Sequence, residues 1–274
     1  MKVGIKFLFF LILTIMSCSD ESVEVFEVEE ELENSSAPTT PNILLIIADD
    51  MGLDACPGYD IGNVKPHMPN LQSLINSGVR FTNLWSNPTC TPTRAGIITG
   101  RYGFRTNVLA VDDPLSTSET SIQKYLDLNT NNTYAHAVIG KWHLSKDDNH
   151  PNDMGVDYFA GFTGGGVPSY TNWTLNVNGV MNRSTEYTTT RFTDLAIEWK
   201  DNQTQPWLLW LAYNAPHTPF HLPPEDLHYQ GALSSDQSSI DINPLSYYLA
   251  ALEALDTEMG RLINSLSNDE KVIL

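Results

Sequence analysis

The chain has 274 residues, of which 41% are hydrophobic, so it can bury one substantial core and is long enough for one or two domains. Its formal net charge of −18 at pH 7 argues against a nucleic-acid backbone as a partner. Many of the acidic residues crowd between positions 20 and 33, so the overall acidity does not identify a substrate.

The first 18 residues have the pattern of an export signal, with Lys2 and Lys6 before an apolar run at residues 7–16 that is too short to cross a bilayer comfortably. The run leads into Ile15-Met16-Ser17-Cys18, which is similar to a bacterial lipobox, in which the cysteine is lipidated. The alternative is an ordinary cleaved signal with a chance cysteine. We expect an exported protein, lipid-anchored to the membrane at the bacterial periplasm or outer surface.

Residues 19–40 are acidic and have few large apolar side chains, which predicts a solvated, disordered tether. Such a spacer suits a lipid anchor at Cys18. Folded structure is expected over residues 41–274.

A continuous apolar run at residues 42–48 predicts a buried strand of a mostly parallel sheet. It ends on Asp49-Asp50, where ligands bind in open α/β sheets. Two adjacent carboxylates repel each other unless a cation is present, and oxygen ligands suit calcium or magnesium. Taken alone, however, such a pair is more often a loop start or a helix cap.

The next elements are predicted as scaffold. An amphipathic helix opens at Pro69 and stops at Gly78, and residues 79–84 are expected to form a short strand. A second helix is expected near residues 118–128, with Tyr125 among its inward-facing side chains.

The segment Cys90-Thr91-Pro92-Thr93-Arg94 predicts a helix that begins at Thr91 or Pro92, because proline is tolerated in a first turn. Cys90 would then lie at the helix N-terminus, where free N–H groups favour an anion, and Arg94 would follow one turn later. A lone cysteine before a helix is more often a small buried hydrophobe.

A second apolar strand is predicted at residues 134–139, and it delivers Gly140-Lys141-Trp142-His143-Leu144. Residues two apart in an extended segment point to the same side, so Lys141 and His143 would face one spot. The alternative is a coincidental surface pair.

The polar stretch at residues 149–187 contains Gly164-Gly165-Gly166 and predicts loops and short strands around a site. No lysine that starts a helix follows the glycines, which excludes a P-loop.

A third buried strand is predicted at residues 206–213, after a helix that buries Phe192 and Leu195. His217 follows this strand between Pro216 and Pro219. The two prolines would hold it in a stiff loop, which suits orienting a leaving group or binding an anion; the alternative is an ordinary turn residue. A final helix is expected over residues 244–267, with an apolar face that starts at Leu245. Residues 271–274 look like the start of another strand of the sheet.

The sequence resembles the type I sulfatases, members of the alkaline-phosphatase-like superfamily, over roughly residues 41–274. The resemblance implies an α/β fold with a mostly parallel central sheet and helices on both faces. It rests on three blocks: Cys90-Thr91-Pro92-Thr93-Arg94 followed by Thr99-Gly100, Gly140-Lys141-Trp142-His143-Leu144, and Pro216-His217-Thr218-Pro219.

The resemblance also implies roles. A maturation enzyme would convert Cys90 to formylglycine, which works as a hydrated aldehyde, and Arg94 would orient the hydrate. Lys141 would contact the sulfate, His143 would hold the hydrate, and His217 would contact the sulfate ester. The substrate would be a sulfate ester, and an exported lipoprotein suggests a sulfated carbohydrate.

The metal ligands implied are Asp49, Asp50 and the modified Cys90, most simply around Ca²⁺, with Mg²⁺ as the alternative. In the family a later strand ends in Asp-Asn or Asp-His, which completes this site, and a second lysine and a smaller subdomain follow. None of these occurs before Leu274. We therefore expect a C-terminally truncated N-terminal portion of a sulfatase, whose metal site is only half encoded.

Two rival functions remain, and so does one alternative pairing of the cysteines. A phosphoester or phosphonate monoester hydrolase of the same superfamily is one, and a lipoprotein that binds sulfated glycans without cleaving them is another. A disulfide between Cys56 and Cys90 is possible in an oxidising compartment, but the chemistry of the Cys90 block explains that cysteine better.

Overall fold

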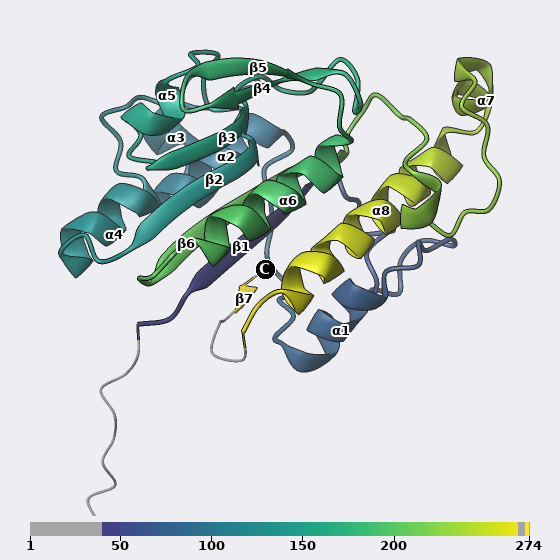
Figure 1. Ribbon diagram of the computed structural model, residues 1–274, viewed down its shortest axis with the longest axis horizontal. Helices are drawn as coiled ribbons and strands as arrows, with labels where there is room; N and C mark the ends of the chain where they lie inside the picture. Colours follow the sequence, from purple (N-terminus) through teal and green to yellow (C-terminus); the bar gives the residue numbers. More distant parts are fainter. Residues whose placement is uncertain (1–39, 268–271, 274) are drawn as a thin grey trace, which may run out of the picture. The chain divides into compact units, whose positions relative to one another are not determined.

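The computed structural model describes residues 40–267 and 272–273, and the folded unit spans Thr40–Leu274 (Figure 1). The predicted export signal and acidic tether lie outside the described residues. Within the described part of the chain, no helix is long and apolar enough to cross a membrane.

A seven-stranded sheet with the order β5-β4-β3-β2-β6-β1-β7 organises this unit. The pairs that involve β1, β2 and β6 are parallel, and β4 runs antiparallel to both of its neighbours. The prediction of a mostly parallel sheet is confirmed. The strands are β1 (Ile43–Asp49), β2 (Ala135–Lys141), β3 (Tyr158–Phe162), β4 (Trp173–Val177), β5 (Val180–Ser184), β6 (Trp207–Pro216) and β7 (Val272–Ile273).

The three predicted apolar runs became β1, β2 and β6, which lie next to one another in the sheet. Their continuous apolar character follows from burial on both faces. The segment after residue 271 also pairs as predicted, because β7 runs parallel to β1 opposite Leu44 and Leu45.

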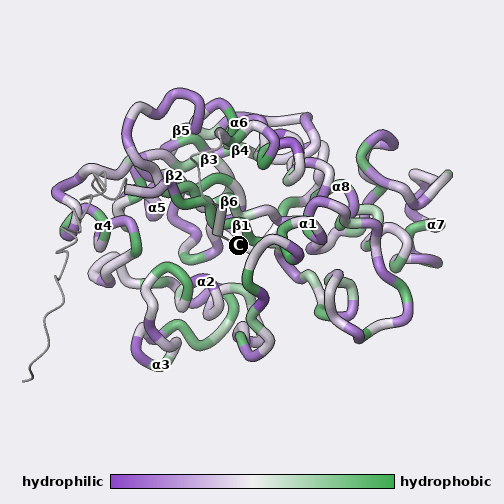
Figure 2. The backbone as a smooth tube through the Cα atoms, turned by 90° about the horizontal axis from the view of Figure 1, so that it is seen from below, coloured by the Kyte–Doolittle hydropathy of each residue, from purple (hydrophilic) through white to green (hydrophobic). Residues whose placement is uncertain are grey.

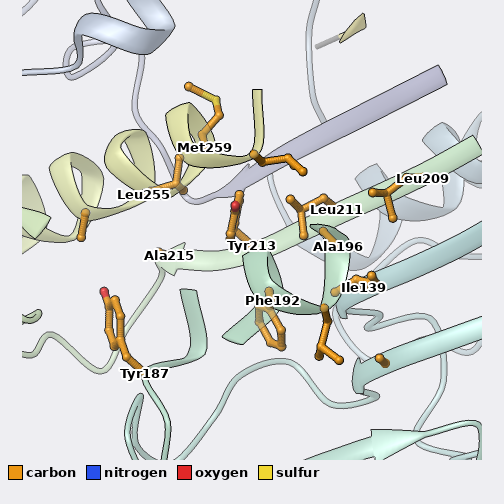
Figure 3. Packing of buried hydrophobic residues seen from close by; sticks show 14 of the residues in the cluster. Ile139, Tyr187, Phe192, Ala196, Leu209, Leu211, Tyr213, Ala215, Leu255 and Met259 are labelled. Atoms are coloured by element: carbon orange, nitrogen blue, oxygen red, sulfur yellow. The ribbon is translucent and has the colours of Figure 1, made fainter. Parts of the chain in front are cut away.

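Helices cover both faces of the sheet. On one face, α6 (Thr188–Asp201) and α8 (Pro244–Asn264) pack against alternate side chains of β6, and Figure 3 shows Tyr213 in one cluster with Ala196 and Leu255. On the other face, α2 (Cys90–Thr99) packs Ala95 and Ile98 into a second cluster. Figure 2 shows the hydrophobic strands between α6 on one side and α2 on the other.

The remaining helices are short: α1 (Pro69–Ser77), α3 (Gly103–Thr106), α4 (Ile122–Thr130), α5 (His150–Asp153), η1 (Glu225–Leu227) and α7 (Gln237–Ile242). The predicted helix at Pro69 is confirmed as α1. The predicted helix near residue 118 begins later, because Ser121 caps α4 by accepting a hydrogen bond from the Lys124 N–H.

Three scaffold predictions are wrong. Residues 79–84 form no strand in the described structure, and their side chains Val79, Phe81 and Leu84 are 68–83% exposed. Both edges of β1 are already paired, with β6 and β7, so this segment has no free edge there. Tyr125 is exposed because the buried face of α4 centres on Gln123, and Leu245 is exposed because burial along α8 begins at Tyr247.

Candidate functional site

The site lies where β1, β2 and β6 end, at one edge of the sheet. Asp49 is the last residue of β1, Lys141 is the last residue of β2, and His217 directly follows β6. Because parallel strands end at the same edge, three segments far apart in sequence deliver side chains to one place. Asp49 and Lys141 are both buried.

The helix α2 brings Cys90 and Arg94 to this edge. It begins at Cys90, close to the predicted start, and Pro92 lies in its first turn, where a missing N–H costs nothing. Cys90 is partly exposed, whereas Arg94, one turn later, is almost fully buried. The cysteine therefore faces the open side of the site at a helix N-terminus, with a cation below it.

Two buried cations share one buried carboxylate. Lys141 Nζ donates to Asp49 Oδ2, and Arg94 Nη2 lies 3.4 Å from Asp49 Oδ1. Arg94 Nη1 also donates to the backbone oxygen of Lys141 at 2.5 Å. Burial lowers the pKa of Arg94, and the Asp49 carboxylate opposes that effect. Arg94, Lys141 and Asp49 together carry one net positive charge, and the carboxylate of Asp50 in the same cleft offsets it.

His143 faces Cys90 from a tight turn after β2. Its Nδ1 lies 3.1 Å from Cys90 Sγ, and its Nε2 lies 2.8 Å from Asp112 Oδ1. Burial lowers the pKa of His143, and the hydrogen bond to Asp112 opposes that effect. Strand alternation does not bring Lys141 and His143 together, because β2 ends at Lys141 and His143 has a left-handed φ of 53°. The two side chains nevertheless converge as predicted.

His217 lies beside the exposed aspartate. Its Nε2 is 3.6 Å from Asp50 Oδ2, and its side chain is 24% exposed. The Tyr170 hydroxyl donates to the backbone oxygens of His217 and Asn214 at 2.5 and 2.9 Å, which fixes the turn after β6. The structure thus places all of the predicted catalytic residues at one edge.

The glycine triplet contacts both histidines. A Cβ on Gly165 would lie 2.8 Å from Cε1 of His143, which is closer than real Cβ contacts allow, and one on Gly166 would lie 3.5 Å from Cε1 of His217. The polar stretch at residues 149–187 therefore does reach the site. Gly165 is required where the backbone passes over the imidazole ring.

Asp112 is a site residue that the sequence did not reveal; the glycine triplet was expected near a site, but the contact between Gly165 and His143 was not predicted. Asp112 lies 31 residues before His143 along the chain, in a loop without a recognisable motif. No local pattern identifies it, because only the fold brings the loop to the histidine.

The cleft at the site has a volume of about 210 Å³, and Asp49, Asp50, Cys90 and Arg94 are among its lining residues. Both oxygens of Asp49 face cations, whereas the Asp50 side chain is 63% exposed. Among residues 40–267 and 272–273, no three histidine, cysteine or acidic residues gather in a way that could hold a metal ion. The described residues thus offer two carboxylates but do not form a closed metal site.

Comparison with known proteins identifies the family. The sulfatase family profile matches residues 41–274. The uncharacterized sulfatase YdeN of Escherichia coli K12 is 29% identical over 285 residues, which cover 84% of this chain and 49% of YdeN. Mouse arylsulfatase J is 30% identical over 263 residues, which cover 84% of this chain and 40% of that protein.

A solved structure agrees with this relationship. The crystal structure of Ps i-CgsB superposes with a TM-score of 0.68 at 29% identity, covering 82% of this chain and 55% of that chain. It has also been solved in complex with k-i-k-neocarrahexaose. The chain thus spans about half the length of the relatives it matches. Members of this family generally use a divalent metal and a formylglycine. On its sequence and on its fold, the chain belongs to the sulfatase family.

Proposed function

We propose that the complete gene product hydrolyses sulfate esters at the edge formed by β1, β2 and β6. The observation that carries this proposal is the pair of buried cations, Arg94 and Lys141, which share the single carboxylate of Asp49 beside Cys90. In the described part of the chain, Arg94 Nη2 is buried without a hydrogen-bond acceptor. A sulfuryl oxygen bound beside Cys90 would be stabilised by the charge of these two cations.

Cys90 is proposed as the precursor of a formylglycine, which would supply a hydroxyl nucleophile for sulfur and later release the sulfate. Cys90 Sγ marks where an oxygen of that group would stand. His143 Nδ1, at 3.1 Å from Sγ, is within reach to accept a proton there. Arg94 and Lys141 stabilise the charge on the sulfuryl oxygens, and His217 contacts the ester.

A divalent ion, Ca²⁺ or otherwise Mg²⁺, is proposed to bind Asp49, Asp50 and the modified residue 90. Two carboxylates alone are about half of the oxygen ligands that such ions take. Among the described residues, no group of three histidine, cysteine or acidic residues is arranged so that it could hold a metal ion. The 274-residue chain by itself is therefore expected to bind Ca²⁺ weakly, and assays of turnover need the complete gene product together with a maturation enzyme.

A comparison of an aryl sulfate with the matching aryl phosphate tests the proposal and its rival, a phosphoester or phosphonate monoester hydrolase. We expect kcat/KM for the sulfate to exceed that for the phosphate by at least about 100-fold, because the Gly140-Lys141-Trp142-His143 and Pro216-His217-Thr218-Pro219 blocks resemble those of sulfatases. Mass spectrometry of the peptide that contains residue 90 should show formylglycine. Higher kcat/KM for the phosphate would favour the rival.

The natural substrate is proposed to be a sulfated carbohydrate, since Ps i-CgsB was crystallised with k-i-k-neocarrahexaose. The cleft of about 210 Å³ is smaller than a typical pocket for a small molecule, so most of a sugar would lie outside it. A second candidate is a lipoprotein that binds such glycans without cleaving them. It would be favoured if the glycan binds while residue 90 remains cysteine and no sulfate is released.

Export and lipid anchoring through Cys18 are also proposed, on the pattern of residues 1–18. Cys18→Ala should move the protein from the detergent phase to the aqueous phase, because it removes the acceptor of the lipid. Phase partition followed by immunoblotting measures this change, and identical partition of both proteins would contradict the anchor.

A further inference from the structure

His143 is hydrogen-bonded to the carboxylate of Asp112, a residue that lies outside the three motif blocks. Asp112 Oδ1 lies 2.8 Å from His143 Nε2, and the second oxygen, Oδ2, accepts a hydrogen bond from Lys146 Nζ at 2.7 Å. The two hydrogen bonds also lower the pKa of Asp112, so this carboxyl group is ionised near neutral pH. An ionised carboxylate can only accept hydrogen bonds.

The loop that carries Asp112 is tied to the beginning of α2. The Asp112 N–H donates to Thr91 Oγ1 at 3.2 Å, and Thr91 is fully buried next to Cys90. Asp112 has a left-handed φ of 67°, and Asp50 and His143 at the same site share this region with φ values of 70° and 53°. A non-glycine residue in this conformation is unfavourable, and its occurrence at a site suggests that the local geometry serves a function.

We infer that Asp112 is a positioning residue that fixes the tautomer of His143. Since Asp112 can only accept, the proton of the neutral imidazole must lie on Nε2. The lone pair then lies on Nδ1, which faces position 90 at 3.1 Å. The ring has little freedom to turn, because Gly165 passes directly over its Cε1–Nε2 edge.

The consequence for catalysis rests on the proposed function. If position 90 carries a hydroxyl nucleophile, His143 can accept its proton only through an unprotonated Nδ1. The wrong tautomer would point an N–H at the nucleophile. In the serine-protease triad, a change that traps the histidine in the wrong tautomer lowers kcat about 10⁴-fold.

The structure suggests an isosteric test, Asp112→Asn. Lys146 Nζ donates to Asp112 Oδ2 at 2.7 Å, so an amide oxygen that keeps this hydrogen bond puts the NH₂ group of the new side chain toward His143 Nε2. That arrangement moves the ring proton to Nδ1. Asp113→Asn is the matched control, because Asp113 accepts hydrogen bonds from the N–H groups of Leu109 and Ala110, and no contact between Asp113 and His143 is observed.

The first measurement, which reports the tautomer of His143, does not require an active enzyme. Ring ¹⁵N chemical shifts of His143 in the 274-residue chain, assigned with His143→Gln, should show the Nε2–H tautomer in the wild type and in Asp113→Asn. In Asp112→Asn they should show the Nδ1–H tautomer. An Nδ1–H tautomer in the wild type would overturn the inference.

The second readout is turnover of an aryl sulfate by the complete gene product. Asp112→Asn should lower kcat by about 10²- to 10⁴-fold and change KM by less than about 3-fold, whereas Asp113→Asn should keep both near the wild-type values. Equal loss in both variants would mean that the loop has only a structural role. If the wild type hydrolyses no sulfate ester, the proposed function fails, but the tautomer measurement still decides the role of Asp112.

Discussion

Replacing Cys90 with alanine is expected to reduce the hydrolysis of an aryl sulfate by the complete gene product to the background rate. Alanine cannot be oxidised to an aldehyde, so the site would keep its cations but lose its nucleophile. Loss of a covalent nucleophile typically lowers kcat by about 10⁵-fold or more. Fold should be retained, because Cys90 is partly exposed and contributes little to the core. Initial rates and circular dichroism measure the two effects.

Cys56→Ala provides the matched control for this prediction. Cys56 is the other free cysteine of the described residues, and burial raises the pKa of its thiol, as expected for an inert packed cysteine. Its removal should leave kcat/KM within about 3-fold of the wild type. Cys90→Ser should give at most one slow turnover, because a serine sulfate ester has no second hydroxyl to expel the sulfate. Undiminished activity of Cys90→Ala would exclude the formylglycine mechanism.

The sequence predicted the central strands well because burial on both faces leaves a continuous apolar run. The runs before Asp49, Lys141 and Asn214 have the length and apolar character of such strands, and each is one. The error at residues 79–84 has the opposite cause. That segment has strand composition, but a strand also needs a partner at a free edge, and in the described structure these residues are exposed and pair with none. Composition does not reveal which edges are free.

The residues of the site also fall into two groups, those that the sequence reveals and those that only the structure reveals. Cys90, Lys141 and His217 belong to short blocks whose residues and spacing are distinctive, so they could be found from the sequence. Asp112 contacts His143 across 31 residues and has no distinctive neighbour in sequence, whereas Gly165 stands in a conspicuous glycine triplet whose contact with His143, 22 residues before it, is visible only in the structure. Only the packing of their loops onto the end of β2 reveals them.

Replacing Lys141 with methionine is the second change with a large expected effect, and it should separate activity from stability. The variant removes one of the two cations that would bind the sulfate, so kcat/KM should fall by about 10²- to 10³-fold, as for the loss of one preorganised electrostatic contact. Stability should respond differently. Removing one partner of a buried pair usually costs about 3–5 kcal/mol, because the other charge is left alone.

Asp49 would not be left alone, because Arg94 Nη2 remains 3.4 Å from its Oδ1. The variant also removes the desolvation cost of a fully buried ammonium and its repulsion with Arg94, so we expect Tm to stay the same or rise. Lys200→Met is the matched control. Lys200 is also buried and pairs with Asp201 on α6, away from the site, so kcat/KM should stay within about 3-fold of the wild type. If Lys141→Met unfolds the protein, Lys141 serves the fold. If it keeps Tm and loses catalysis, Lys141 serves the bound anion, since Arg94 alone is then sufficient to stabilise the buried carboxylate of Asp49.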